Sequence, residues 1–168
     1  SMGSYLLRRY LSVYGGGLSG AVIMGTGANP DAVAKLGMAV CKAIAAFKGW
    51  KYRSPFMEKL FFSGDFQKFD MDGTHPENSW LTKDTEIVRF YYSEPRCTFK
   101  FTLKAYYDFL KTVYYVNRKE NVEKIPKDLP ILMVAGDCDP VGEFGKAVKR
   151  VYEMYKAAGI NDVTLKLY

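Results

Sequence analysis

The sequence lacks the segments on which several classes of protein depend. No run approaches the ~18 to 20 consecutive apolar residues of a membrane span, and no basic, apolar, small-residue signal sequence opens the chain. The three cysteines, Cys41, Cys97 and Cys138, are odd in number and lie in unlike contexts. This usage argues against a disulfide framework and for a reducing compartment. We therefore expect a cytoplasmic protein with no stable membrane insertion.

The sequence also lacks a basic block, a glycine-rich phosphate loop and any nucleic-acid motif. Its formal net charge is +6, but Lys and Arg are dispersed among Asp and Glu along the whole chain. This pattern is typical of a solvated basic surface. We expect no nucleic-acid partner, no cofactor and no metal.

Aromatic residues, by contrast, are concentrated in the middle of the chain. Eighteen of the 26 Phe, Tyr and Trp residues lie between Trp50 and Tyr115. With 168 residues, the chain has the size of one domain and can bury a core of its own. The aromatic middle therefore indicates a region that covers or binds something apolar.

Two apolar runs without alternation predict buried parallel strands. Residues 18–25 and 130–136 are each bounded by glycine or proline, as is typical of strands covered on both faces. Residues 163–168 alternate, which suits a strand nearer the sheet edge that is exposed on one face. Helical spacing predicts a helix over 143–158, ended by Gly159. This order is typical of an α/β fold with parallel strands.

The first residues predict an amphipathic helix over 2–14, ended by three glycines at 15–17. Its apolar residues repeat at helical spacing, and Arg8 and Arg9 face away from them. The expected apolar stripe consists of Leu6, Leu7, Tyr10, Leu11 and Tyr14.

A long insert from about residue 28 to 127 separates the two buried strands and reads as helical. Asn29-Pro30-Asp31 begins a helix that Gly49 closes, and Ser54-Pro55 begins a second. Thr82 is the expected cap of a third helix, and residues 98–115 predict a fourth. Residues 63–79, with two glycines and a proline, read as a loop.

The motif GDCDPVG, residues 136–142, follows the second buried strand. Functional groups gather at the carboxyl ends of parallel strands, so a carboxylate here is well placed for chemistry. Asp137 or Asp139 is equally suited to cap the helix that begins near Val141. These residues alone leave both readings open.

GDCDPVG, with the GKAVKRVYEMYKAAGINDVTLKLY that starts three residues later, resembles the last third of α/β hydrolases of the lysophospholipase, monoacylglycerol lipase and serine aminopeptidase type. The start resembles the second half of their G-x-S-M-G-S motif, followed by a helix carrying Arg9-Tyr10-Leu11. The insert resembles the helical cap of bacterial members. The matching segments there are Phe47-Lys48-Gly49, Tyr52-Arg53-Ser54, Trp80-Leu81-Thr82-Lys83-Asp84 and Glu94-Pro95-Arg96-Cys97, with Glu94 where aspartate is more usual.

This resemblance implies the C-terminal part of an α/β-hydrolase parallel sheet with a helical cap insertion. It implies a partial hydrolase domain over residues 1–168, with the cap at 28–127. It also implies that Ser1 is the nucleophile, that Asp139 is the acid of a Ser-Asp-His triad, and that the Met2 backbone N–H is an oxyanion donor. The only histidine, His75, lies in the predicted loop, and we assign it to an exposed position.

On this interpretation, the chain runs from the nucleophile to the strand before the catalytic histidine and is inactive alone. The rival accounts of Ser1 are a remnant of cloning and an N-terminal nucleophile. The α/β pattern does not support the second account, because the fold of N-terminal-nucleophile hydrolases is built on antiparallel sheets.

The expected substrate is a small lipid ester, because the insert is apolar. A short peptide is the alternative substrate, and a binding module without catalysis is the alternative function. The sheet edge next to the first strand is expected to be open and to drive self-association.

Overall fold

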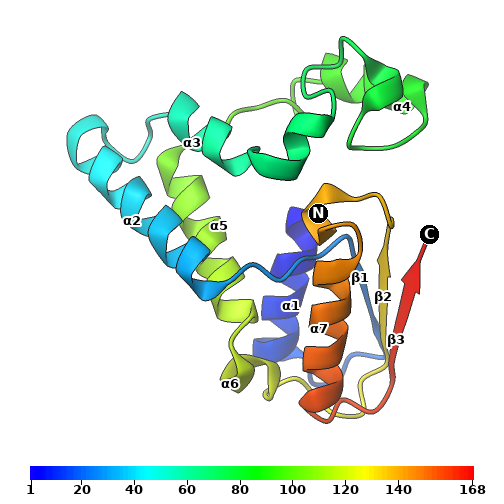
Figure 1. Cartoon of the computed structure of the whole chain (residues 1–168). Coiled ribbons are helices and arrows are strands. Elements are labelled where there is room, and N and C mark those ends of the chain that lie inside the picture. Colours follow the sequence, from blue (N-terminus) through cyan, green and yellow to red (C-terminus); the bar gives the residue numbers. More distant parts are fainter. The chain divides into compact units, whose positions relative to one another are not determined.

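Three parallel strands form the sheet of this protein, with β2 at its centre. The strands are β1 (Ala21–Met24), β2 (Ile131–Ala135) and β3 (Val163–Leu167) (Figure 1). The computed structural model describes all 168 residues. They divide into two compact units, one of residues 1–40 and 107–168 and one of residues 41–106. The sheet belongs to the first unit, which confirms the predicted α/β class.

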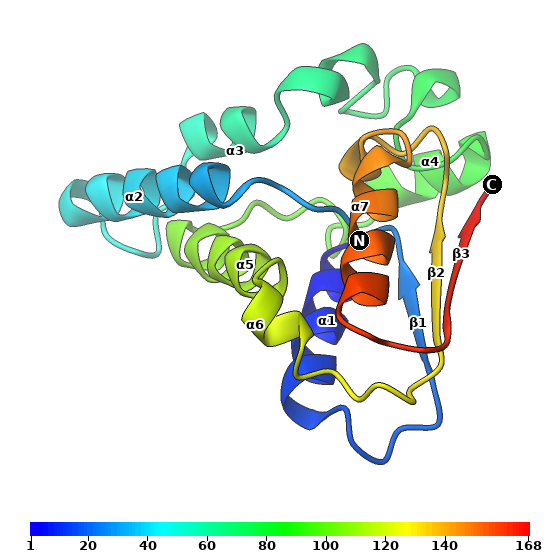
Figure 2. The ribbon, with the colours of Figure 1, turned by 60° about the horizontal axis from the view of Figure 1, so that its bottom comes forward.

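Helices α1 (Met2–Tyr14) and α7 (Lys146–Ala157) lie on the same face of the sheet in both views (Figures 1 and 2). The apolar core of the unit is formed between these helices and the strands. Its buried members include Leu11 of α1, Ile23, Met133 and Val163 of the strands, and Val151 and Tyr155 of α7. Burial of these side chains fixes both helices on the sheet.

The opposite face of the sheet corrects one prediction. We expected β1 to be covered on both faces, but Val22 and Met24 are 54% and 63% exposed. Alternate residues of a strand point to opposite faces, so Ile23 and the partly buried Ala21 face the core while Val22 and Met24 face away from it. The prediction that the strand at 163–168 lies at the sheet edge is confirmed.

Helix α1 has the predicted bounds, but it buries a different face. Leu6, Tyr10 and Tyr14 of the expected apolar stripe are about half exposed or more. The buried residues are instead Ser4, Tyr5, Arg8, Leu11 and Ser12. The prediction that Arg8 faces away from the packed side is therefore wrong. The packed face is partly polar because it binds backbone carbonyls, and hydrophobicity did not reveal it.

Helix α7 begins three residues later than predicted. Glu143, Phe144 and Gly145 all have positive φ, of 49°, 55° and 83°. Left-handed residues cannot continue a right-handed helix, so α7 starts at Lys146. The short 3₁₀ turn Pro140–Gly142 precedes this segment.

The segment between β1 and β2 is helical, as predicted. It contains α2 (Asp31–Lys48), α3 (Pro55–Phe61), α4 (Thr85–Ser93), α5 (Leu103–Val116) and α6 (Lys119–Val122), with 3₁₀ turns at Gly64–Lys68 and Pro76–Asn78.

Two predicted helix starts are wrong. Asp84, not Thr82, caps α4 by accepting from the amides of Glu86 and Ile87. Helix α5 begins at Leu103 rather than near residue 98, and the Thr102 hydroxyl accepts from the Ala105 amide in its first turn.

The second unit, residues 41–106, has an aromatic core. Phe62, Phe66 and Trp80 form one cluster, with ring centroids 5.5 to 6.3 Å apart. Tyr106 contacts Phe61 and Phe101 in another. Many of the clustered aromatic residues therefore pack within this unit. The proposed cap boundaries at 28–127 stay a prediction.

Candidate active site

Ser1 lies at the N-terminus of α1 and against the carboxyl end of β1. Its main-chain nitrogen donates a hydrogen bond to the Gly25 carbonyl at 2.5 Å, and Gly25 directly follows β1. The Ser4 hydroxyl lies within hydrogen-bond distance of the carbonyls of both residues, at 2.7 Å from Ser1 and 3.2 Å from Gly25. These contacts hold the start of the helix at this rim of the sheet.

Asp139 lies at the same rim. Its Oδ1 accepts from the Val141 amide at 2.8 Å, and a methyl group placed on Gly25 would lie 3.4 Å from its Oδ2. The same methyl group would lie 3.3 Å from the Ser1 main-chain nitrogen. One carboxylate oxygen thus caps the turn, while the other lies beside Gly25 and Ser1.

Asp137, the other carboxylate of the motif, is used differently. Its side chain is exposed, and its main-chain amide donates to the Tyr168 carbonyl at the end of β3. The contacts at Gly25 therefore distinguish Asp139 from Asp137. The sequence left open whether an aspartate of this motif caps a helical turn or acts as the acid. Asp139 is compatible with both roles, because its Oδ1 caps the turn while its Oδ2 lies beside Gly25.

The N-terminus of α1 supplies a positive local field beside Ser1. The first amides of a helix have no intrahelical carbonyl to bind, and the Met2 amide is the first of α1. No acidic residue occupies the first turn to neutralise the helix dipole. Gly3 lies close to the Ser1 hydroxyl oxygen, since an added methyl would make an ordinary van der Waals contact with it at 3.6 Å. An anion that forms near Ser1 would be stabilised here.

Arg8, which no sequence pattern marked as a binding residue, is 1% exposed and binds the loop that follows β1. Its guanidinium donates to the Thr26 hydroxyl and to the Gly27 carbonyl. Tyr5, Arg8 and Leu11 are spaced so that they lie on one face of a helix. An arginine argues against burial of such a face unless buried carbonyls are present to bind it, and the sequence does not show those carbonyls.

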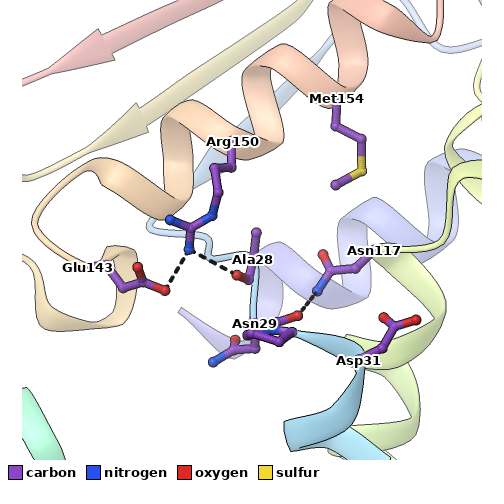
Figure 3. A pocket seen from close by; sticks show the side chains of 8 residues that line it. Ala28, Asn29, Asp31, Asn117, Glu143, Arg150 and Met154 are labelled. Carbon is purple, nitrogen blue, oxygen red and sulfur yellow. Dashed lines mark hydrogen bonds and ion pairs between the residues drawn. The ribbon is translucent and has the colours of Figure 1, made fainter.

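Further side chains bind the same loop (Figure 3). Arg150 of α7 donates to the Ala28 carbonyl at 3.1 Å and pairs with Glu143 at 2.6 Å. Asn117, after α5, donates to the Asn29 carbonyl at 3.2 Å. The connection from β1 to α2 is therefore bound by side chains from α1, α7 and the turn after α5.

A pocket of about 490 Å³ lies beside this connection. Its polar lining comes from Asn29, Asp31, Asn117, Glu143 and Arg150, and Met154 contributes an apolar wall. Both carboxylates in the lining have arginine partners, since Arg118 pairs with Asp31 at 3.3 Å and Arg150 pairs with Glu143. Ser1, Met2 and Asp139 are not among its lining residues.

His75 lies in the second unit, in the 63–79 segment. Its side chain is 74% exposed and lies 3.4 Å from the Glu77 carboxylate. This position confirms the prediction of an exposed loop histidine.

Two negative findings describe the rest of the chain. No group of three or more His, Cys, Asp or Glu side chains is arranged to hold a metal ion. No helix is long and apolar enough to cross a membrane.

Comparison with known proteins gives a family match over the whole chain. Residues 1–168 match the family model described as serine aminopeptidase, S33. A search of curated protein sequences finds no match.

Solved structures that resemble the chain include an esterase and two lipases. A thermostable carboxyl esterase from Bacillus coagulans, crystallised with glycerol, has 27% identity and a TM-score of 0.84, covering 99% of this chain and 53% of the esterase. A lipase in an open form has 22% identity and a TM-score of 0.76, over 98% and 53%. A monoglyceride lipase from Saccharomyces cerevisiae has 19% identity and a TM-score of 0.67, over 100% and 50%. The chain thus spans about half the length of each.

Proposed function

Since residues 1–168 belong to the serine aminopeptidase S33 family of α/β hydrolases, we propose that the protein containing them hydrolyses carboxylic esters of small lipids. In this proposal, Ser1 is the nucleophile and Asp139 is the acid of a Ser-Asp-His triad. The observation that carries the proposal is the approach of Ser1 and Asp139 to the same residue, Gly25, at the carboxyl ends of parallel strands.

The proposed chemistry has two steps. The Ser1 hydroxyl oxygen attacks the ester carbonyl while a histidine accepts its proton, and the alcohol leaves with a proton returned by that histidine. Water then cleaves the acyl-enzyme by the same route and releases the carboxylic acid. Asp139 would hold the imidazole in the required tautomer and stabilise it when it is charged. The Met2 amide would donate to the oxyanion in both steps.

The histidine of this scheme is proposed to lie outside these 168 residues. His75 is exposed and faces Glu77, and no other histidine is present. We therefore propose that the 168-residue chain has negligible esterase activity by itself. Rapid hydrolysis of a nitrophenyl ester by the purified chain, abolished by Ser1→Ala, would contradict this part of the proposal.

The proposed substrate class rests on two observations. The structure with 27% identity is a carboxyl esterase, and the second unit is rich in aromatic residues suited to an acyl chain. The family description favours a second candidate, cleavage of an amino-terminal residue from a short peptide.

Fluorophosphonate labelling of the longer protein tests the function. The probe should modify Ser1, Ser1→Ala should abolish labelling, and the exposed Ser19→Ala should leave it unchanged. Hydrolysis rates for nitrophenyl esters and aminoacyl nitroanilides then separate the two substrate classes. Faster anilide cleavage would replace the ester proposal by the peptide one. Absence of labelling would favour a binding module.

A further inference from the structure

The most deeply buried charged side chain of the protein is Arg8. It lies on α1, about two helical turns after Ser1. All four of its hydrogen bonds go to uncharged oxygens. Nη1 donates to the Thr26 hydroxyl at 3.2 Å and the Gly27 carbonyl at 2.8 Å, while Nη2 donates to the Val116 carbonyl at 3.0 Å and the Asn117 amide oxygen at 2.8 Å.

These four acceptors lie on two separate segments of the first unit. Thr26 and Gly27 belong to the connection that leaves β1 for α2, and Val116 and Asn117 lie at the end of α5. One nitrogen of the guanidinium binds each segment. Only the planar fork of arginine presents donors in both directions at once, because lysine has a single charged nitrogen. Arg8 therefore fastens both segments to the helix that begins at Ser1.

The loop bound by Arg8 continues directly to the candidate catalytic pair. Gly25, which precedes Thr26, is the residue against which Ser1 and Asp139 both lie. A methyl group on Gly27 would lie 2.7 Å from both the Tyr5 hydroxyl and the Val141 carbonyl, so this glycine is closely enclosed. The amide of Val141 holds Oδ1 of Asp139. A shift of Gly27 would therefore displace Val141, which binds Asp139, and Tyr5 of α1, the helix that begins at Ser1.

A purely stabilising role fits this arrangement poorly. A buried cation with no carboxylate partner loses its hydration, and well-packed apolar residues often replace buried charges with no loss of stability. Burial raises the pKa of Tyr5 to about 12, and the nearby charge of Arg8 opposes that shift. Arg8 does, however, fix the backbone on which the site is built.

We propose that Arg8 is a positioning residue for the proposed hydrolysis, acting through the Gly25–Gly27 loop and making no contact with the substrate. This inference rests on the proposed function, since it assigns Arg8 to the geometry of Ser1 and Asp139. A displacement of about 1 Å at a catalytic group can lower a rate about 100-fold. Loss of Arg8 should therefore lower kcat strongly and change KM little.

The test uses the longer protein that contains these residues, with Arg8→Met and Arg8→Lys. Arg9→Met is the matched control, because it removes the same charge from the exposed side of the same helix. Four quantities are measured for each variant: the rate of fluorophosphonate modification of Ser1, kcat and KM for a nitrophenyl ester, and the thermal midpoint. Assays are run well below every midpoint, with and without sucrose, which stabilises folded proteins.

Arg8→Met should lower the labelling rate and kcat about 100-fold, and sucrose should not restore them. Arg8→Lys keeps the charge but not the fork, so it should show an intermediate loss while remaining folded. If Arg8→Met does not fold, Arg8→Lys alone decides, and a labelling rate equal to the unmodified protein overturns the proposal. Recovery of both rates in sucrose would also overturn it, since that result indicates a stability effect only.

The unmodified protein separates the two hypotheses. If Ser1 of the unmodified protein is labelled and both Arg8 variants are labelled at the same rate, the positioning role is refuted while the proposed function stands. No labelling of the unmodified protein refutes the proposed function, and the role of Arg8 falls with it.

Discussion

Ser1 and Asp139 both approach Gly25 at the carboxyl end of β1. A methyl group on this glycine would lie 3.3 Å from the Ser1 main-chain nitrogen and 3.4 Å from Oδ2 of Asp139. The two residues are separated by most of the sequence, and the parallel pairing of β1 with β2 brings them together. The rim of the sheet thus brings together the two residues that we propose as nucleophile and acid.

Asp139→Asn should abolish most hydrolysis without unfolding the protein. The amide oxygen of asparagine can still accept from the Val141 amide, so the turn is preserved. The neutral side chain cannot stabilise a charged imidazole or select its tautomer, and kcat should fall about 10⁴-fold. Steady-state kinetics and thermal unfolding of the longer protein measure both effects. Asp137→Asn is the control, and a larger loss of activity in that variant would move the acid to Asp137.

Gly25→Ala should reduce both stability and activity. Gly25 has φ of 59°, and its added methyl would press on Ser1 and Asp139. An alanine in the left-handed region costs about 1–2 kcal/mol of folding free energy. Urea unfolding measures this loss, and fluorophosphonate labelling measures the displacement of Ser1.

Gly17→Ala is the matched control for Gly25→Ala. Gly17 also has positive φ, of 81°, but a methyl group at this position meets nothing within 4 Å, and Gly17 is exposed. Equal effects of the two substitutions would show that the crowding at Gly25 is unimportant.

The sequence predicted those parts of the fold that depend on local patterns. The glycines after Tyr14 and the alternation in 163–168 predicted the end of α1 and the position of β3. The GDCDPVG motif predicted the turn in which Asp139 lies. In each case, one short segment contains the whole signal.

The packed face of α1 could not be predicted because backbone carbonyls form part of the surface that it contacts. Hydrophobic spacing favoured the side with Leu6 and Tyr10, yet the packed side carries Ser4 and Arg8, which bind carbonyls of the distant loop. The tertiary structure determines which carbonyls accept hydrogen bonds from a buried arginine. The residue types along α1 therefore do not reveal these carbonyls.

Met133→Ala should destabilise the protein far more than Met24→Ala in the 168-residue chain. Met133 of β2 is fully buried in the core between sheet and helices, and its truncation should cost about 2–5 kcal/mol. Met24 of β1 is 63% exposed on the opposite face, so its truncation should leave the unfolding free energy nearly unchanged. Similar losses in urea unfolding would show that both faces of the sheet are covered in solution.

The 168-residue chain should self-associate through β1. This strand pairs only with β2, so one row of its amides and carbonyls is unpaired, and Val22 beside that row is 54% exposed. Open apolar edges pair readily with other chains. Analytical ultracentrifugation should show concentration-dependent association that Val22→Lys reduces, because a charge at an edge opposes pairing. Thr164→Lys is the control, since Thr164 occupies the same cross-strand row at the opposite edge. If it reduced association equally, the contact would lie at β3 or on the sheet face rather than at β1.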